Sequence, residues 1–328
     1  MKRILGIGNA LVDILILIDD DGILEAFDLP KGSMQLVDIK KSEQIQDNTR
    51  NFSQTRSSGG SVANTIHGLA MLGIDAGYIG STGKDATGDF FENDLKAAGV
   101  KTYLTRRNSV TGTALTLISP DSERTFATHL GAAVELHPGD LDPAWFREHD
   151  ILYVEGYLIT DAALVEKACL LARESNMTIA LDLASYNVVE AYRDSFKKIA
   201  DRYVDILFAN EMEAEAFTGV PSMQALDLMG NSVELVVIKA GANGSWLRKG
   251  KKTIKIDATP VRCADTTGAG DLYASGFLYG YATGMDLEKC GLIGSMMAEK
   301  VIGITGARMS KTEFTEIINN IGKIVQGP

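Results

Sequence analysis

The sequence predicts an α/β protein whose main domain is a mainly parallel sheet covered by helices on both faces, with a small β-sheet lid. Two observations lead to this fold class. Short runs of β-branched residues alternate with helix-compatible stretches of ten or more residues along most of the 328-residue chain, which is typical of parallel sheets. Residues 13–37 and 101–130 instead combine strand-like and turn residues without a helical period, and they favour a small antiparallel sheet standing off the main domain.

The elements of the main domain are expected in the following order along one domain that spans residues 1–328. A buried strand is expected at Arg3–Ile7, and the pair Gly59-Gly60 introduces a helix over Ser61–Leu72. The next elements are a strand at Ala76–Ile79, a helix over Thr87–Ala98, and strands at Ile151–Val154, Thr178–Asp182 and Asp205–Ala209. Leu235–Ile256 contains three strand-like runs separated by glycine turns, the pattern of a β-meander. The chain closes with helices, the last introduced by a capping box of Ser310 and Glu313.

Composition restricts the classes of partner. The chain has 32 basic and 43 acidic side chains and a net charge of −11, without a Lys/Arg run of five residues, so nucleic acid is not an expected partner. It has no stretch of 18 uncharged apolar residues, so no membrane partner is expected either. Three scattered cysteines predict neither a disulfide framework nor a zinc site. We expect a cytoplasmic protein that acts on a small molecule.

The strongest motif is Asp265-Thr266-Thr267-Gly268-Ala269-Gly270-Asp271, which directly precedes a helical run. Small residues before a helix let backbone N–H groups converge at the positive end of its dipole, so Gly268, Ala269 and Gly270 can form an anion hole for a phosphate in transfer. Asp271 can then accept a proton from a hydroxyl beside that phosphate. The alternative is that the glycines make a tight turn and Asp271 caps the helix.

This motif resembles the C-terminal signature of the ribokinase-like (PfkB-type) family of carbohydrate and nucleoside kinases. The N-terminal signature of that family is matched by Gly59-Gly60-Ser61-Val62-Ala63-Asn64, with Gly73 and Gly83 at suitable spacing. The two signatures occur in the expected order, so the resemblance covers nearly the whole chain. It implies a ribokinase-like three-layer α/β/α (Rossmann-like) domain with a β-sheet lid, which transfers the γ-phosphoryl group of ATP to a primary alcohol.

Three stretches look more similar to adenosine kinases than to sugar kinases: GNALVD at 8–13, ERTFATHLGAA at 123–133, and EGYL at 155–158. The resemblance implies that Asp13 accepts hydrogen bonds from sugar hydroxyls beside the Gly59-Gly60 turn, and that Asn9 and Asn64 add polar contacts. A carboxylate can accept from two vicinal hydroxyls. Read without the resemblance, Asp13 after an apolar strand is equally compatible with a cap or turn residue.

The resemblance also implies residues that hold ATP and Mg²⁺. Asn210 and Glu213 match an N-x-x-E motif that acts around magnesium, through water, since magnesium keeps much of its hydration shell. The alternative is that Glu213 merely complements the dipole of the helix that follows. Lys239, Gly241 and Gly244 belong to a turn that holds ATP by family position, although any strand–turn–strand unit favours glycine there.

The remaining implied roles lie in the lid and near the C-terminus. Arg124 would swing over the transferred phosphate as an arginine finger does, or else be a solvated surface arginine. Phe126 and Tyr157 could stack on a base, or belong to the core. A monovalent cation such as K⁺ is a feature of many relatives, and Asp265, Gly306 and Ser310 fall where its ligands would lie.

The predicted function is therefore ATP-dependent phosphoryl transfer to the 5′-hydroxyl of adenosine or a similar nucleoside. The first alternative is a sugar kinase of the same fold, similar to ribokinase or fructokinase. The second is a catalytically silent nucleotide-binding protein, which would have no need of Asp271. The expected partners are ATP, Mg²⁺ and a small nucleoside or sugar, and the expected assembly is a monomer or a homodimer formed through the lid.

Overall fold

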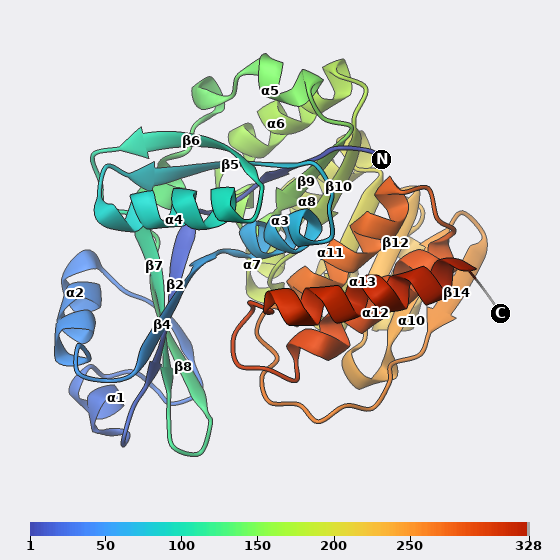
Figure 1. Cartoon of the computed structure of the whole chain (residues 1–328). Coiled ribbons are helices and arrows are strands. Elements are labelled where there is room, and N and C mark those ends of the chain that lie inside the picture. Colours follow the sequence, from blue (N-terminus) through green and yellow to red (C-terminus); the bar gives the residue numbers. More distant parts are fainter. Residues whose placement is uncertain (327–328) are drawn as a thin grey trace.

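The larger of two sheets has nine strands, in the order β14-β13-β12-β11-β10-β9-β1-β5-β6, in a computed structural model that describes residues 1–326 (Figure 1). Neighbouring strands from β6 to β12 run parallel, and β13 and β14 are antiparallel additions at one edge. The strands of this main sheet are β1 (Ile4–Ile7), β5 (Ala76–Gly83), β6 (Lys101–Arg107), β9 (Ile151–Glu155), β10 (Thr178–Asp182), β11 (Ile206–Asn210), β12 (Leu235–Lys239), β13 (Ser245–Lys249) and β14 (Lys252–Ile256).

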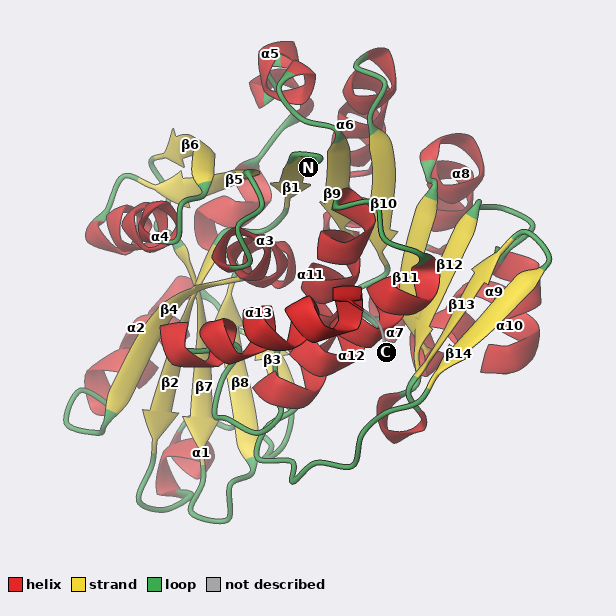
Figure 2. Ribbon diagram, turned by 45° about the vertical axis from the view of Figure 1, so that its right-hand side comes forward, coloured by secondary structure: helices red, strands yellow, loops and turns green. Residues whose placement is uncertain are grey.

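Helices cover both faces of the main sheet, as Figure 2 shows. The reason lies in the alternation of apolar side chains along each strand. In β9, Leu152 and Val154 join one buried apolar cluster, while Ile151 and Tyr153 join another on the opposite face. The first cluster contains residues of helices α6, α8, α9 and α10, and the second contains residues of α3, α4, α11 and α12. The predicted α/β fold with helices on both sides of the sheet is confirmed.

The described helices are α1 (Gly22–Ala26), α2 (Ile39–Asn48), α3 (Ser61–Met71), α4 (Ala86–Ala97), α5 (Pro143–Arg147), α6 (Ala162–Glu174), α7 (Tyr186–Ala191), α8 (Arg193–Tyr203), α9 (Glu211–Thr218), α10 (Ser222–Met229), α11 (Ala269–Ala282), α12 (Leu287–Val301) and α13 (Lys311–Gln326). Short 3₁₀ turns are η1 (Gly131–Glu135), η2 (Pro138–Asp140), η3 (Gly156–Asp161) and η4 (Gly241–Asn243). The strands and helices expected for the main domain agree with these bounds to within a few residues.

A second, five-stranded sheet lies beside the main domain (Figures 1 and 2), in the order β3-β8-β7-β2-β4. Its strands are β2 (Leu11–Leu17), β3 (Met34–Leu36), β4 (Gln54–Gly59), β7 (Gly112–Ile118) and β8 (Arg124–His129). One face of this small sheet packs apolar residues such as Ile14 and Ile16 against Leu24 of α1 and Ile45 of α2. The other face carries Asp13.

Two expectations about the small sheet are wrong. Lys101–Arg107 does not belong to it: β6 pairs in parallel with β5 of the main sheet, because α4 returns the chain after β5 and completes a β-α-β unit. The small sheet is also mixed rather than antiparallel, since β2 pairs in parallel with β7, and β3 with β8. It further includes β4, whose polar sequence QTRSSG has no apolar alternation that would have marked it as a strand.

Candidate active site

Polar side chains lie at the ends of five neighbouring strands of the main sheet. Glu155, Asp182, Asn210 and Lys239 are the last residues of β9, β10, β11 and β12, and Asn9 follows β1 by two positions. All five strands are parallel, so these side chains meet at one edge. Ligands of open α/β sheets bind at this carboxyl edge.

The N-termini of α3 and α11 meet at the same edge. Asp271 lies in the first turn of α11, and its carboxylate accepts hydrogen bonds from Ser61 Oγ (2.7 Å) and Asn64 Nδ2 (2.9 Å) in the first turn of α3. Thr65 Oγ1 donates to the backbone oxygen of Asp271 at 3.0 Å. Burial raises the pKa of Asp271, and the bonds from Asn64 and Ser61 oppose that shift. The structure thus brings together two motifs whose residues Ser61 and Asp271 are 210 positions apart in the sequence.

The turn Gly268–Gly270 has the geometry of an anion site. Gly268 is the N-cap of α11 with φ +75°, and a Cβ added to it would lie 2.5 Å from Cβ of Ala307. Only glycine adopts this left-handed conformation without cost. Nζ of Lys239 lies 3.2 Å from the position that a Cβ of Gly270 would take. An ammonium group therefore adds its charge to that of the helix N-terminus. The backbone N–H of Ala269 donates to the backbone oxygen of Thr266 at 3.1 Å, so it is not free for an anion in this structure.

Lys239 is held in place by Asp182. Nζ of Lys239 donates to Asp182 Oδ2 at 2.9 Å, and the hydroxyl of Tyr153 donates to the same oxygen at 3.1 Å. Burial alone would lower the pKa of Lys239, but Asp182 and Glu213 raise it, so the side chain is charged. Lys239, predicted to bind ATP, thus lies between the strand edge and the anion site.

Asn210 and Glu213 form a closed pair at the start of α9. Asn210 donates from N to Glu213 Oε2 and from Nδ2 to Oε1, both at 2.7 Å, and Glu213 N donates back to Asn210 Oδ1 at 2.8 Å. Burial raises the pKa of Glu213 to about 7. Among residues 1–326 no cluster of three or more His, Cys, Asp or Glu side chains is arranged around a common metal position. These hydrogen bonds form a capping box at the N-terminus of α9, and a role of the pair around hydrated magnesium stays a prediction.

Asp13 lies on β2 beside the end of β4, which is its antiparallel neighbour. A Cβ added to Gly59 would lie 2.2 Å from Cγ of Asp13, so the absence of a side chain at Gly59 makes room for the carboxyl group. Gly60 has φ +94°, and a Cβ there would lie 2.2 Å from the backbone oxygen of Asn9. Burial raises the pKa of Asp13 to about 7. Gly59 and Gly60 are therefore required by the close approach of Asp13 and Asn9.

Two amide oxygens in this corner lack a protein partner. Asn9 Oδ1 and Asn64 Oδ1 are buried, and neither accepts a hydrogen bond from any described residue. The amide of Asn9 is oriented by Glu155, whose Oε1 accepts from Asn9 Nδ2 at 2.8 Å and whose Oε2 accepts from Val62 N at 3.2 Å. Buried acceptors of this kind are normally satisfied, so both oxygens can accept hydrogen bonds from a bound ligand.

Arg124 connects the small sheet to the anion-site loop. Its Nη1 donates to Thr267 Oγ1 at 3.1 Å and forms an ion pair with the buried carboxylate of Asp265. Asp265 also accepts from the backbone N–H of Thr267 at 2.8 Å and from that of Gly306. Arg124 is therefore not a solvated surface side chain, because it bonds to the loop that begins the DTTGAGD motif.

The residues predicted to bind a monovalent cation have other partners. The carboxylate of Asp265 is occupied by Arg124, Thr267 and Gly306, and Ser310 forms a capping box with Glu313, whose Oε2 accepts from Ser310 N at 2.6 Å. A cation here would be held by backbone carbonyl oxygens. That site stays a prediction.

A cavity of about 610 Å³ adjoins the anion site on the side of β12 and β13. Its lining includes the three predicted ATP residues Lys239, Gly241 and Gly244 and the anion-site residues Ala269 and Gly270. A volume of this size suits a nucleotide. The cavity therefore reaches Gly270, the residue that directly precedes Asp271.

The two aromatic residues predicted to stack on a base lie in different parts of the site. Phe126 is on β8 of the small sheet, on the same face as Asp13. Tyr157 follows β9, and its pKa is raised to about 12 by burial and by the charges of Glu155, Asp271 and Glu213. Glu155 and Asp182 lie at this edge without a role predicted from the sequence, although an acidic residue directly at the end of a buried strand is a signal that identifies such positions.

A doubly covered parallel sheet, with an aspartate between two helix N-termini and a glycine-rich anion site, defines a ribokinase-like phosphotransferase. The chain belongs to the pfkB family of carbohydrate kinases, because the model of that family matches residues 32–313. The confirmed family makes the protein an ATP-dependent phosphotransferase.

Solved structures and curated relatives agree with this family. The chain is similar to a protein from Rhizobium etli described as a "probable sugar kinase", with 32% identity, a TM-score of 0.88 and 98% of each chain covered. It is also similar to the adenosine kinase of Sinorhizobium meliloti, with 33% identity, a TM-score of 0.87, and 97% of this chain and 99% of that chain covered. The adenosine kinase of Saccharomyces cerevisiae is 28% identical over 307 residues, which are 86% of this chain and 89% of the yeast protein.

Proposed function

We propose that the protein transfers the γ-phosphoryl group of ATP to the 5′-hydroxyl of adenosine or a similar nucleoside. The observation that carries this proposal is that the hydroxyl-binding corner continues into an apolar surface on the same face of the small sheet. The corner consists of Asp13 with the unpartnered amide oxygens of Asn9 and Asn64. A nucleoside has a sugar and a base, and these two surfaces fit one part each.

The register of the small sheet gives the composition of the apolar surface. Residues paired across neighbouring strands project from the same face of a sheet. Two such rows begin at β2 and run to β3: Asp13, Ala114, Thr128 and Leu36 in the first, and Leu15, Thr116, Phe126 and Met34 in the second. Leu36 and Met34 are 65% and 55% exposed, which suits side chains that a bound ring would cover.

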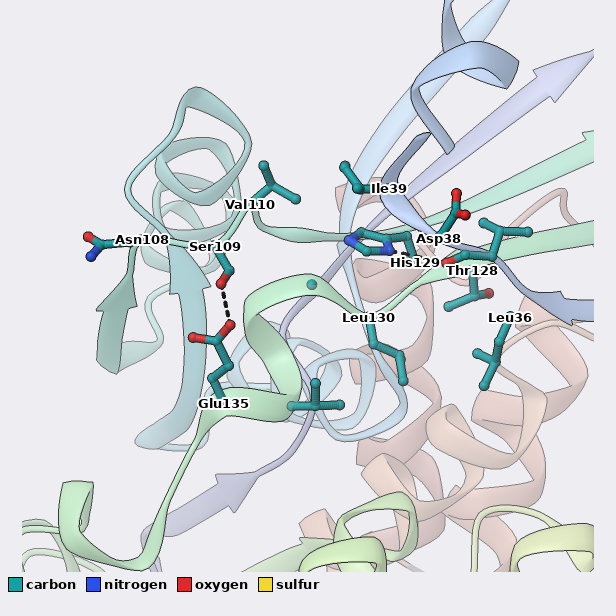
Figure 3. A pocket seen from close by; sticks show the side chains of 13 residues that line it. Leu36, Asp38, Ile39, Asn108, Ser109, Val110, Thr128, His129, Leu130 and Glu135 are labelled. Atoms are coloured by element: carbon teal, nitrogen blue, oxygen red, sulfur yellow. Dashed lines mark hydrogen bonds between the residues drawn. The ribbon is translucent and has the colours of Figure 1, made fainter. Parts of the chain in front are cut away.

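A cavity of about 640 Å³ opens beside this surface (Figure 3). Leu36, Thr128 and Leu130 line one side of it, and Val110 and Ile39 line another. The cavity supports the proposal because a base extending along the first row from Asp13 would reach Thr128 and Leu36. Sugar kinases have no need of such an extension.

The arrangement of charges supports in-line phosphoryl transfer. Asp271 would accept the proton of the 5′-hydroxyl as its oxygen bonds to the γ-phosphorus, and the bond from that phosphorus to the oxygen of ADP would break. The N–H groups of Gly268 and Gly270 would hold the equatorial oxygens, with Lys239 and Arg124 offsetting their charge. When bound, Mg²⁺ would neutralise the phosphates of ATP, with Asn210 and Glu213 holding its water shell.

The alternative acceptor is a free sugar. The similarity to the Rhizobium etli protein favours this reading, and the corner formed by Asp13, Asn9 and Asn64 would bind the hydroxyls of a free sugar as well. A silent nucleotide-binding protein is disfavoured, because such a protein has no need of Asp271, which is present and is held by Ser61 and Asn64.

The setting of the protein is likewise proposed. Cys169, Cys263 and Cys290 are free thiols, which supports a reducing, cytoplasmic location. No helix within residues 1–326 combines the length and the apolar character that crossing a lipid bilayer requires. We propose a monomer or a homodimer formed through the small sheet.

The experiment that tests the function is an acceptor panel. The protein would be incubated with ATP, Mg²⁺ and, separately, adenosine, inosine, ribose and fructose, and each product would be identified by ³¹P NMR. We expect adenosine 5′-monophosphate as the main product. Preferential formation of a sugar phosphate would instead establish the alternative.

A further inference from the structure

We propose that Arg308 is a positioning residue that favours the charged form of the Asp13 carboxyl group and fixes the strand end against which this group lies. Arg308 belongs to the loop between α12 and α13, whereas Asp13 belongs to the small sheet. The inference rests on the proposed function in one respect, the binding of acceptor hydroxyls by Asp13. It deepens that function by identifying what gives Asp13 its acceptor character.

Arg308 is anchored at the end of β4. Its Nε donates to the backbone oxygen of Ser58 at 3.1 Å, and its Nη2 donates to that oxygen and to Ser58 Oγ, the latter at 2.6 Å. Ser58 is fully buried, and its N and Oγ donate to Asp94 Oδ2 at 2.9 and 2.6 Å. A chain of hydrogen bonds thus runs from α4 through β4 to Arg308.

The side chain of Asp13, on β2, lies against Gly59, the residue that follows Ser58 in β4. Its carboxyl group fills the space above Gly59, and Asp13 itself pairs with Ser57 in the β2–β4 ladder. Arg308 and Asp13 therefore contact consecutive residues, Ser58 and Gly59. The guanidinium of Arg308 also has an Nη1 that is buried and has no partner among the described residues.

Charged groups of α4 and α11 also act on Asp13 and Arg308. Burial is the largest influence on the pKa of Asp13 and raises it to about 7; the charge of Arg308 lowers this pKa, and that of Asp271 of α11 raises it. Burial lowers the pKa of Arg308 to about 10, while the charges of Asp94 of α4, Asp13 and Asp271 raise it. Arg308 is therefore protonated at neutral pH. His67 of α3 is neutral, since burial and Arg308 lower its pKa to about 3.

Asp13 is consequently near the midpoint of its ionisation at neutral pH, and the positive charge of Arg308 favours its ionised form. Without that charge, burial and Asp271 would leave Asp13 protonated. A protonated carboxyl loses acceptor capacity for two vicinal hydroxyls. Acceptor affinity at neutral pH then depends on an arginine that does not touch the acceptor in this account.

The test that needs no substrate is a titration of Asp13 in the ligand-free protein. Aspartate would be labelled with ¹³C at Cγ, and the Asp13 signal assigned by its loss in Asp13→Asn. We expect a midpoint near 7 in the wild type. Arg308→Gln should raise it by about one unit, and Arg308→Lys should keep it within about half a unit of the wild type because the charge is retained. Arg56→Gln, the same change at an exposed position of β4, should leave it unaltered.

An unchanged midpoint in Arg308→Gln would overturn the proposal. If that variant does not fold, Arg308→Lys decides: a midpoint near that of the wild type supports the role of the charge, and a midpoint raised by a full unit contradicts it. Thermal unfolding of every variant shows whether the fold is retained.

The kinetic arm uses adenosine as the probe. Moving the midpoint of Asp13 from about 7 to 8 lowers its ionised fraction at pH 7 about fivefold. Because only the ionised form would bind adenosine well, KM for adenosine should rise about fivefold. The difference should disappear near pH 9 and in an Asp13→Asn background, whereas purely structural damage would lower kcat at every pH. Absence of turnover of adenosine by the wild type would refute the proposed function while the NMR titration still decides the role of Arg308.

Discussion

The carboxylate of Asp271 accepts a hydrogen bond from the hydroxyl of Ser61 at 2.7 Å, although 210 positions separate the two residues in the chain. Each residue lies in the first turn of a helix, so the N-termini of α11 and α3 face one point. A phosphoryl group in transfer and the hydroxyl that attacks it would meet there. Burial raises the pKa of Asp271, which brings a carboxylate closer to the basicity of an effective general base.

The first prediction concerns Asp271. Asp271→Asn should lower kcat at least about a hundredfold, the scale of general-base catalysis, because the amide cannot take the hydroxyl proton. Binding of ATP, measured by calorimetry, should stay nearly unchanged. Asp286→Asn is the matched control: Asp286 caps α12 through Lys289 N, and asparagine caps equally well. Retention of most of the activity in Asp271→Asn would remove this residue from the mechanism.

The second prediction concerns magnesium. Glu213→Gln should raise the Mg²⁺ concentration needed for half-maximal rate, because one oxygen of the carboxylate is replaced by an amide that cannot accept from magnesium-bound water. Glu313→Gln makes the same change in the capping box with Ser310 and separates the metal effect from helix capping. If both variants show the Mg²⁺ dependence of the wild type, Glu213 acts as a cap alone.

The third prediction concerns Arg124. Because Arg124 is already bonded to Thr267 and Asp265, a small rearrangement would bring its guanidinium to a phosphate at Gly268–Gly270. Arg124→Gln should lower kcat at least about a hundredfold with a smaller effect on KM for ATP. Arg124→Lys should recover little, since lysine lacks the planar fork. Arg106→Gln, which breaks a surface pair with Glu92, should be neutral in the same assay, and a neutral Arg124→Gln would contradict the role.

The fourth prediction concerns stability. The folded-state pKa of Asp13 is about 7, above the value of about 4 in an unfolded chain. Between these values the folded protein binds a proton that the unfolded chain has released, so the contribution of Asp13 to the free energy of unfolding falls as pH rises through about 4–7. Asp13→Asn should therefore raise Tm at pH 8 and change it little at pH 4. Equal Tm values for variant and wild type at pH 8, measured by calorimetry, would show that Asp13 carries no such cost.

Local sequence signals predicted the parts of the site that begin helices. They failed for contacts between residues that are far apart in the sequence. The sequences GGSVAN and DTTGAGD mark the starts of α3 and α11, because a glycine at the N-cap with small residues beside it is a local signal for a helix N-terminus. Arg308 carries no such signal, since its partner Ser58 lies 250 positions away. The sheet to which β6 belongs likewise depends on the crossover through α4 and not on its own composition. Tertiary placement of this kind is absent from any local window of sequence.

The nucleoside specificity is tested most directly by competition. Adenosine and ribose would be supplied together at equal concentration with limiting ATP, and the ratio of the two phosphorylated products measured, which equals the ratio of kcat/KM values. We predict a ratio of at least about one hundred in favour of adenosine, equivalent to roughly 2.7 kcal/mol of transition-state binding from the base. A product mixture dominated by ribose phosphate would contradict the nucleoside assignment.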